Sequence, residues 1–248
     1  MGAKPPEVFI ALPWKNEVNH YLCRKTTAML KIERLIFNPF QENTYVVSDE
    51  TGECVIIDAG NHTSREETAL TDLLQNNGLE PVMAINTHGH VDHLLGVSYV
   101  KERFGVPFAL HGADRFLLES AMQHAMLYGF DLQQVPAVEI DLAAAPAVTF
   151  GETVLKVIHT PGHSPGHLCF YNEKEKILFT GDTLFKESIG RTDLPGGDYD
   201  QIMRSILERI VPLGGEVTFY PGHGSSSTIG HELIYNPFIA EVLHGEVG

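Results

Sequence analysis

The stretch "THGHVDHLLG", residues 87–96, places three histidines and one aspartate between two apolar runs. The run before it, "PVMAIN", has the length and composition of a buried strand, and the run after it has helical spacing. His88 and His90 lie two residues apart, so in extended backbone their side chains leave on the same side and can bind one ion. Asp92 and His93 come at the start of the expected helix and can contact a second ion. The stretch therefore predicts a metal-binding corner between a strand and a helix.

Three later stretches share this arrangement, in which a β-like run ends and a histidine or aspartate follows within a few residues. They are "IHTPGH" at 158–163, "FTGDT" at 179–183 and "FYPGH" at 219–223. Strand ends are rigid, and the short loops after them can direct side chains from distant parts of the chain to one point. An isolated histidine in such a place is usually a surface or hydrogen-bonded residue. The recurrence of the pattern instead favours one shared metal centre.

The remaining chain has the pattern of two β-rich halves with helices outside. The runs "NTYVVSD" and "ECVIIDAG" predict a hairpin, and Ser64 with Glu67 predicts the capping box of a following helix. In the second half, Asp198 is expected to begin another helix. Residues 1–28 show no sustained hydrophobic period, so we expect an N-terminal extension there and one domain over 29–248.

Composition limits the partners of the protein. Of its 248 residues, 43% are hydrophobic and 20% charged, which is typical of a globular domain, and no apolar run approaches the length of a membrane span. The net charge of -15 and the lack of a Lys/Arg cluster speak against nucleic acid. Cys23, Cys54 and Cys169 lack CxxC spacing, which favours a reducing compartment. We expect a cytoplasmic protein with no membrane or nucleic-acid partner, and the oligomeric state stays open.

The motifs "THGHVDH", "HTPGHSPGH", "TGDTLF" and "YPGHG", in this order, resemble the metallo-β-lactamase superfamily from about residue 29 to 240. The resemblance implies an α/β fold, a four-layer αββα sandwich with two divalent ions at one edge. Zinc is the expected metal, although iron and manganese share the same donors. The metal ligands implied by the resemblance are His88, His90 and His163 for one ion, Asp92, His93 and His223 for the other, and Asp182 as a bridge. His159 and His167 are expected to be structural.

Two ions close together lower the pKa of a shared water and stabilise charge on a carbonyl oxygen, so such a site favours hydrolysis. The stretches "GDTLFKESIGRTDLPGGD" and "PGHGSSSTIGHE" resemble the short forms of glyoxalase II, the hydroxyacylglutathione hydrolases. This resemblance implies a small thioester or ester substrate such as S-D-lactoylglutathione, attacked by a hydroxide that the metal pair activates and Asp92 orients. Arg191 is a candidate to bind a substrate carboxylate, and an ion pair with Asp193 is the alternative for its side chain.

The sequence is also compatible with other functions. Persulfide dioxygenases resemble the same ligand set but use one Fe(II), and a lactonase is also compatible with the motifs. A β-lactamase is disfavoured because His93 and the lack of a cysteine ligand differ from the common zinc β-lactamases. A purely structural metal site is disfavoured because such sites are usually closed and rich in cysteine.

Overall fold

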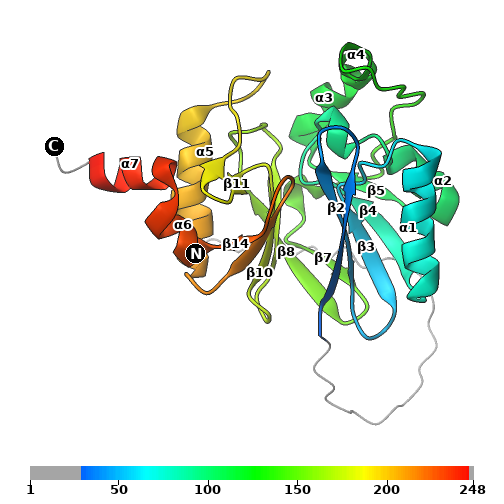
Figure 1. The fold of residues 1–248 in the computed structure, drawn as a ribbon, viewed down its shortest axis with the longest axis horizontal. Helices are drawn as coiled ribbons and strands as arrows, with labels where there is room; N and C mark the ends of the chain where they lie inside the picture. The colour runs from blue at the N-terminus through cyan, green and yellow to red at the C-terminus, as the bar shows by residue number, and fades with distance from the viewer. Residues whose placement is uncertain (1–28, 246–248) are drawn as a thin grey trace, which may run out of the picture.

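Two six-stranded sheets pack face to face at the centre of the structure, a computed structural model that describes residues 29–245. Helices cover the outer face of each sheet, which gives four layers in the order αββα (Figure 1). The predicted sandwich is confirmed. The extension expected over 1–28 lies outside the described residues, so its boundary stays a prediction.

The first sheet has the strand order β1-β2-β3-β4-β5-β6. Its first three strands are antiparallel, and β3 to β6 run parallel to one another. The predicted hairpin is present as β2 and β3, with Tyr45 opposite Ile57. The strands are β1 (Lys31–Phe37), β2 (Glu42–Ser48), β3 (Glu53–Ile57), β4 (Glu80–Ile85), β5 (Phe108–Leu110) and β6 (Ile140–Asp141).

The second sheet has the strand order β14-β13-β10-β9-β8-β7. Only β10 and β13 are parallel neighbours in this described sheet, and the other pairs are antiparallel. A separate ribbon follows β10 and is made of β11 (Leu184–Phe185) and β12 (Ser188–Ile189). The strands of the second sheet are β7 (Ala147–Phe150), β8 (Thr153–His159), β9 (Leu168–Asn172), β10 (Ile177–Gly181), β13 (Thr218–Pro221) and β14 (Ser227–Thr228).

Helices α1 and α2 lie on the first sheet and α5 to α7 on the second, while α3 and α4 stand at the edge above the first sheet (Figure 1). Within 29–245, every helix is too short or too polar to cross a membrane. The helices are α1 (Ser64–Asn76), α2 (Val97–Phe104), α3 (Arg115–Glu119), α4 (Ala121–Leu127), α5 (Tyr199–Ser205), α6 (Ile229–Tyr235) and α7 (Pro237–Gly245). Short helical turns are η1 (Val91–His93), η2 (Gly112–Asp114), η3 (Leu142–Ala144), η4 (Ile206–Ile210) and η5 (Val211–Leu213).

The capping box of α1 lies one residue earlier than the sequence suggested. Thr63, in extended backbone, is the N-cap residue, and its partner is Glu66 rather than Glu67. The carboxylate of Glu66 also accepts hydrogen bonds from the backbone of Asn38 at 2.9 Å and of His62 at 2.9 Å, which fixes the register. The predicted N-cap of α5, by contrast, is correct, because Asp198 accepts a hydrogen bond from the backbone of Gln201.

Three apolar clusters correspond to the three interfaces between the layers. Phe170 and Phe179 lie between the two sheets, Leu70 and Leu74 attach α1 to the first sheet, and Ile202 attaches α5 to the second. The sheets therefore hold the loops at their edge on a well-packed support.

We expect Phe170→Ala to lower the free energy of unfolding by about 3–5 kcal/mol, because it removes a fully buried ring between the sheets. Urea unfolding followed by circular dichroism measures this. The control Ile234→Ala, at a side chain that is 68% exposed, should change it by less than about 0.5 kcal/mol. Equal effects of the two substitutions would contradict the assigned core.

Candidate metal centre

All seven predicted ligand side chains come together at one edge of the sandwich. They arrive from loops that follow β4, β8, β10 and β13. Within each of three overlapping groups, the candidate ligand atoms all lie within 4.8 Å of one another. The groups are His88, His90 and His163; His88, His93 and Asp182; and Asp92, His93 and His223.

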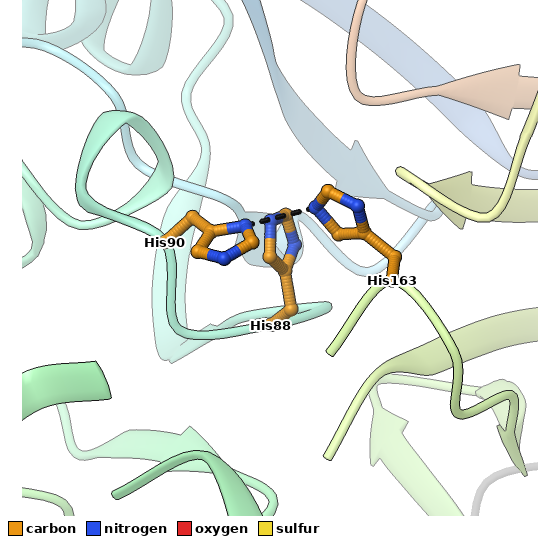
Figure 2. A group of neighbouring side chains, drawn as sticks. All are labelled: His88, His90 and His163. Carbon is orange, nitrogen blue, oxygen red and sulfur yellow. Dashed lines mark hydrogen bonds between the residues drawn. The ribbon is translucent and has the colours of Figure 1, made fainter. Parts of the chain in front are cut away.

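The first group consists of three imidazoles that face a common point (Figure 2). His88 and His90 come from the loop after β4, and His163 comes from the loop after β8. Nδ1 of His90 lies 2.8 Å from Nε2 of His163. The side chains of His88 and His90, two residues apart in the first motif, thus turn toward the same point, as the sequence predicted.

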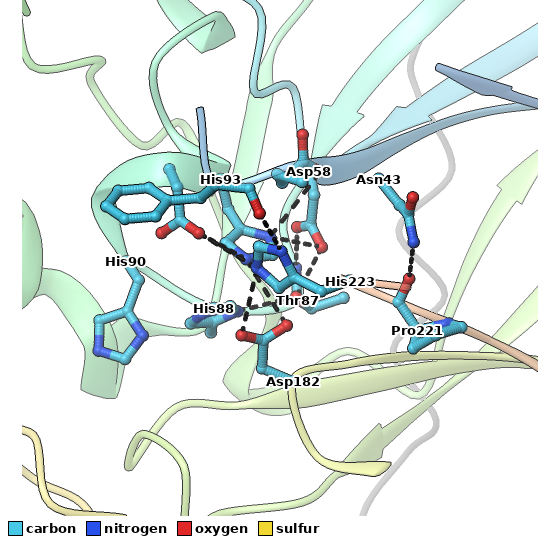
Figure 3. Close-up of polar contacts among 12 residues, drawn as sticks. Asn43, Asp58, Thr87, His88, His90, His93, Asp182, Pro221 and His223 are labelled. Carbon is cyan, nitrogen blue, oxygen red and sulfur yellow. Dashed lines mark hydrogen bonds and ion pairs between the residues drawn. The ribbon is translucent and has the colours of Figure 1, made fainter. Parts of the chain in front are cut away.

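Asp182 lies close to imidazoles of this group and of the group formed by Asp92, His93 and His223 (Figure 3). Its carboxylate oxygens are 3.6 Å from Nε2 of His163, 3.6 Å from Nε2 of His223 and 3.6 Å from Nε2 of His93. Asp92 belongs to the latter group, with Oδ2 at 3.2 Å from Nε2 of His223. The carboxylate of Asp182 therefore lies close to histidines of both groups.

Backbone carbonyls hold the outer nitrogens of two of these rings. Nδ1 of His163 donates to the carbonyl oxygen of Arg191 at 2.8 Å, and Nδ1 of His223 donates to that of Phe40 at 3.0 Å. A carbonyl oxygen can only accept, so in both rings Nδ1 carries a proton, and Nε2 is the nitrogen left to bind a metal ion. The ring orientation and the tautomer that metal binding needs are therefore built in.

Asp58 lies beside the outer nitrogen of His93, and the sequence reasoning missed it. Its backbone has φ 54°, and its carboxylate accepts hydrogen bonds from the backbone N–H and the hydroxyl of Thr87, both at 2.7 Å. The same carboxylate lies 3.2 Å from Nδ1 of His93. The signal was present, because "VIIDAG" also ends a β-like run with an aspartate.

Asp114 is a second residue that the sequence reasoning did not single out. It is fully buried, and it accepts hydrogen bonds from the backbone of Gly89 at 3.0 Å, the hydroxyl of Ser164 at 2.7 Å and the backbone of Gly166 at 2.6 Å. These contacts join the loop of His88 and His90 to the loop of His163. Only the fold brings these positions together, so no local pattern indicated them.

The two histidines predicted to be structural lie outside the ligand groups. Nε2 of His167 accepts a hydrogen bond from the backbone N–H of Asp182 at 3.0 Å, which helps to fix that residue. His159 stacks on His111 with ring centroids 4.5 Å apart, and its Nε2 lies 2.8 Å from the carbonyl oxygen of Pro165. Both support the loops around the site.

The three-histidine group favours neutral imidazoles. Burial and the neighbouring imidazoles hold the pKa of His88 well below its ordinary value. Burial and the facing His163 lower the pKa of His90 to about 3. Both rings are therefore neutral at physiological pH, which is the form that binds a cation.

The group of Asp92, His93 and His223, with Asp182 beside it, combines histidines of raised pKa with ionised carboxylates. Burial lowers the pKa of His93 and His223, but the carboxylates of Asp92 and Asp182 outweigh it and hold both pKa values above the ordinary one. Burial alone would raise the pKa of both carboxyl groups, yet the facing imidazoles, His93 first, hold them below the usual range. Two ionised carboxylates thus stand among imidazoles in a buried place.

Several buried atoms of the cluster indicate a binding site for cations. Within residues 29–245, Nε2 of His88, Nε2 of His93 and Oδ1 of Asp182 are buried and have no hydrogen-bond partner. Buried polar atoms are nearly always paired, so such atoms need an explanation. Imidazole nitrogens and carboxylate oxygens are donors for zinc, iron and manganese. The residues present therefore fit divalent metal ions.

A cavity of about 490 Å³ opens beside the cluster. Five of the donor residues line it, together with side chains from the β1–β2 turn, α3, α4 and the β11–β12 ribbon. Arg191 also lines it, and its guanidinium forms two 2.7 Å hydrogen bonds to Asp193. The apolar part of the wall includes Phe40, Leu117, Tyr128, Phe185, Ile189 and Leu194.

Comparison with known proteins agrees with this fold. The sequence profile of the metallo-β-lactamase superfamily matches residues 37–231. Hydroxyacylglutathione hydrolase GloC of Haemophilus influenzae is 34% identical over 217 residues, covering 85% of this chain and 98% of that protein. The crystal structure of BLEG-1 B3 metallo-β-lactamase has a TM-score of 0.76 at 36% identity, covering 85% of this chain and 99% of that chain.

A second solved structure, that of TTHA1623 in a di-iron-bound form, has a TM-score of 0.74 at 36% identity and covers 83% of this chain and 99% of that one. The profile match alone extends over most of the chain. The chain therefore belongs to the metallo-β-lactamase superfamily and is a metal-dependent hydrolase.

Proposed function

We propose that this hydrolase cleaves a small acyl thioester in the manner of glyoxalase II, with S-D-lactoylglutathione or a related thioester as substrate. The observation that carries the proposal is the position of the donor cluster at the wall of a cavity. Structural metal sites are usually closed, whereas a catalytic site keeps a face open to substrate. The name of the Haemophilus influenzae relative, a hydroxyacylglutathione hydrolase, supports the same reaction.

The proposed cofactor is a pair of divalent ions, zinc or iron, with manganese as a further possibility. Three histidines would hold one ion, Asp92, His93 and His223 the other, and Asp182 both. Such ions supply hydroxide near neutral pH and polarise the thioester carbonyl. The di-iron form of one relative supports iron as well as zinc.

Asp92 is the proposed catalytic residue of the chain. Its carboxylate lines the cavity, and His93 and His223 hold its pKa below the ordinary value against the effect of burial, so it is ionised at neutral pH. An ionised carboxylate can only accept hydrogen bonds, so it orients the attacking water or hydroxide by accepting a hydrogen bond from it. The apolar cavity wall excludes other water from the reacting bond and strengthens the electrostatic interactions there.

We propose a cytoplasmic setting, in line with the cysteine usage.

The test is a panel of substrates given to protein of known metal content: lactoylglutathione, a coenzyme A thioester, a homoserine lactone and nitrocefin. We expect thioester turnover that a chelator abolishes. In Asp92→Asn, kcat should fall about 100-fold or more, because an uncharged amide oxygen is a weaker acceptor for the nucleophile than the carboxylate. Asp72→Asn, an exposed position on α1, is the matched control and should not change kcat. Hydrolysis of nitrocefin or the lactone alone, or oxygen uptake with glutathione persulfide alone, would contradict the proposal.

The contact between Asp58 and His93 predicts an effect on metal affinity. We expect Asp58→Asn to weaken metal binding about 10- to 100-fold, because the carboxylate that orients the imidazole is lost while the size of the side chain is kept. Competition with a chromophoric chelator measures the affinity, and circular dichroism checks the fold. An affinity equal to that of Asp72→Asn would show that Asp58 does not position the ligand.

The raised pKa values of His93 and His223 predict that metal uptake releases protons. In the metal-free protein both rings hold a proton more strongly than an ordinary histidine, with His93 well above the usual value. A metal ion needs the neutral imidazole, so the apparent affinity should rise with pH until the pKa of His93 in the folded protein is passed. Calorimetry of zinc binding at pH 7 in buffers of different ionisation enthalpy measures the protons released. A heat independent of the buffer would contradict this prediction.

A further inference from the structure

We propose that the cavity selects thioesters whose thiol part is uncharged and apolar, and that Asp193 enforces this choice by keeping Arg191 engaged. This inference rests on the proposed thioester hydrolysis and names the substrate class for the same site. A glutathione thioester, whose thiol part is charged, is then a poorer substrate than a thioester of an apolar thiol.

The first support is the chemistry of the cavity wall. Apart from the donor residues, the side chains around the cavity are mostly aliphatic or aromatic. Phe40 and Tyr128 meet edge to face with ring centroids 5.2 Å apart, and they remain 42% and 52% exposed. Aromatic surface left open beside a cavity favours an apolar occupant, because burying it is what stabilises the complex.

The second support is the shortage of positive charge. Among the described residues that line the cavity, Arg191 is the only lysine or arginine. The glutathione part of a thioester carries two carboxylates and one ammonium group, and each charge that leaves water needs a partner. The net charge of -15 adds long-range repulsion of anions. Apart from the proposed metal ions, the described cavity wall thus offers one permanently charged cation, Arg191, to the two carboxylates of glutathione.

The third support is that the guanidinium of Arg191 is already paired with Asp193. Nε of Arg191 donates to Oδ1 of Asp193 at 2.7 Å, and Nη2 donates to Oδ2 at 2.7 Å, so both carboxylate oxygens are used. The hydrogen bonds from Arg191 lower the pKa of Asp193 to about 2, and the pair is therefore ionised at any physiological pH.

An exposed ion pair is weak in itself, and the side chains here are 58% and 66% exposed. Its effect on a ligand comes from proximity. Asp193 lies two residues from Arg191, so it competes for the guanidinium at a high effective concentration. A substrate carboxylate that displaced it would then stand beside a second carboxylate. Asp193 acts as a specificity residue without touching the reacting bond.

The experiment compares two thioesters with the same acyl group, S-D-lactoylglutathione and the D-lactoyl thioester of benzyl mercaptan. Wild type should show a kcat/KM at least roughly tenfold higher for the benzyl thioester, the ratio that burial of an aromatic ring can give. Asp193→Asn should lower KM for lactoylglutathione about fivefold with little change in kcat, because the freed guanidinium can bind a carboxylate. The benzyl thioester should respond less than twofold.

Two further variants make the result specific. Asp72→Asn removes the same charge from the exposed face of α1 and should not alter the preference. In the double variant Arg191→Gln, Asp193→Asn, the gain for lactoylglutathione should disappear. A wild-type preference for lactoylglutathione, or an Asp193→Asn protein with an unchanged ratio, would overturn the inference.

A binding measurement separates this inference from the proposed function. Calorimetry of the metal-loaded protein with S-methylglutathione and with benzyl methyl sulfide requires no turnover. If neither thioester is hydrolysed, the proposed reaction fails, but tighter binding of benzyl methyl sulfide, with a gain for S-methylglutathione in Asp193→Asn, still supports the selection. Tighter binding of S-methylglutathione by wild type would contradict it.

Discussion

The metal centre depends on strand ends from two different sheets meeting at one edge. Parallel pairing of β3 with β4, and of β10 with β13, puts the carboxyl ends of each pair side by side. Backbone hydrogen bonds then join the sheets at this edge, from Asn43 to Gly222 at 2.7 Å and from Leu168 to Thr87 at 2.7 Å. The loops with Asp182 and His223 thus face the loop with His88, and their distances are set by the backbone rather than by flexible side chains.

The charges at this edge make metal binding and folding interdependent. Ionised Asp182 is buried and ionised Asp92 is mostly so, which is costly unless positive charge is nearby. Protonated His93 and His223 supply that charge in the metal-free protein, since the same carboxylates raise their pKa values. Cations can take over this role and release the protons, so the site can fold before it is loaded and still bind metal.

The sequence predicted what is local and missed what only the fold brings together. The spacing of His88 and His90 carries its own geometric meaning, and the resemblance supplied the remaining ligands. Asp114 had no such signal, because its partners lie 25 and 52 residues away in the chain. The capping box of α1 was misplaced by one residue, since Thr63 and Ser64 are both good caps and a contact from Asn38 to Glu66 decides between them.

The elements that supply the candidate metal ligands differ from most of the elements that form the rest of the cavity wall. Apart from the donor residues, the cavity wall comes largely from α3, α4, the β11–β12 ribbon and the loop after it, which supply none of the candidate ligands. Phe40 and Arg191 line this wall and also orient His223 and His163, but through backbone carbonyls. Because a side-chain substitution leaves a carbonyl in place, both positions can change substrate preference while the imidazoles stay oriented. Specificity can therefore vary on this fold at little cost to the chemistry.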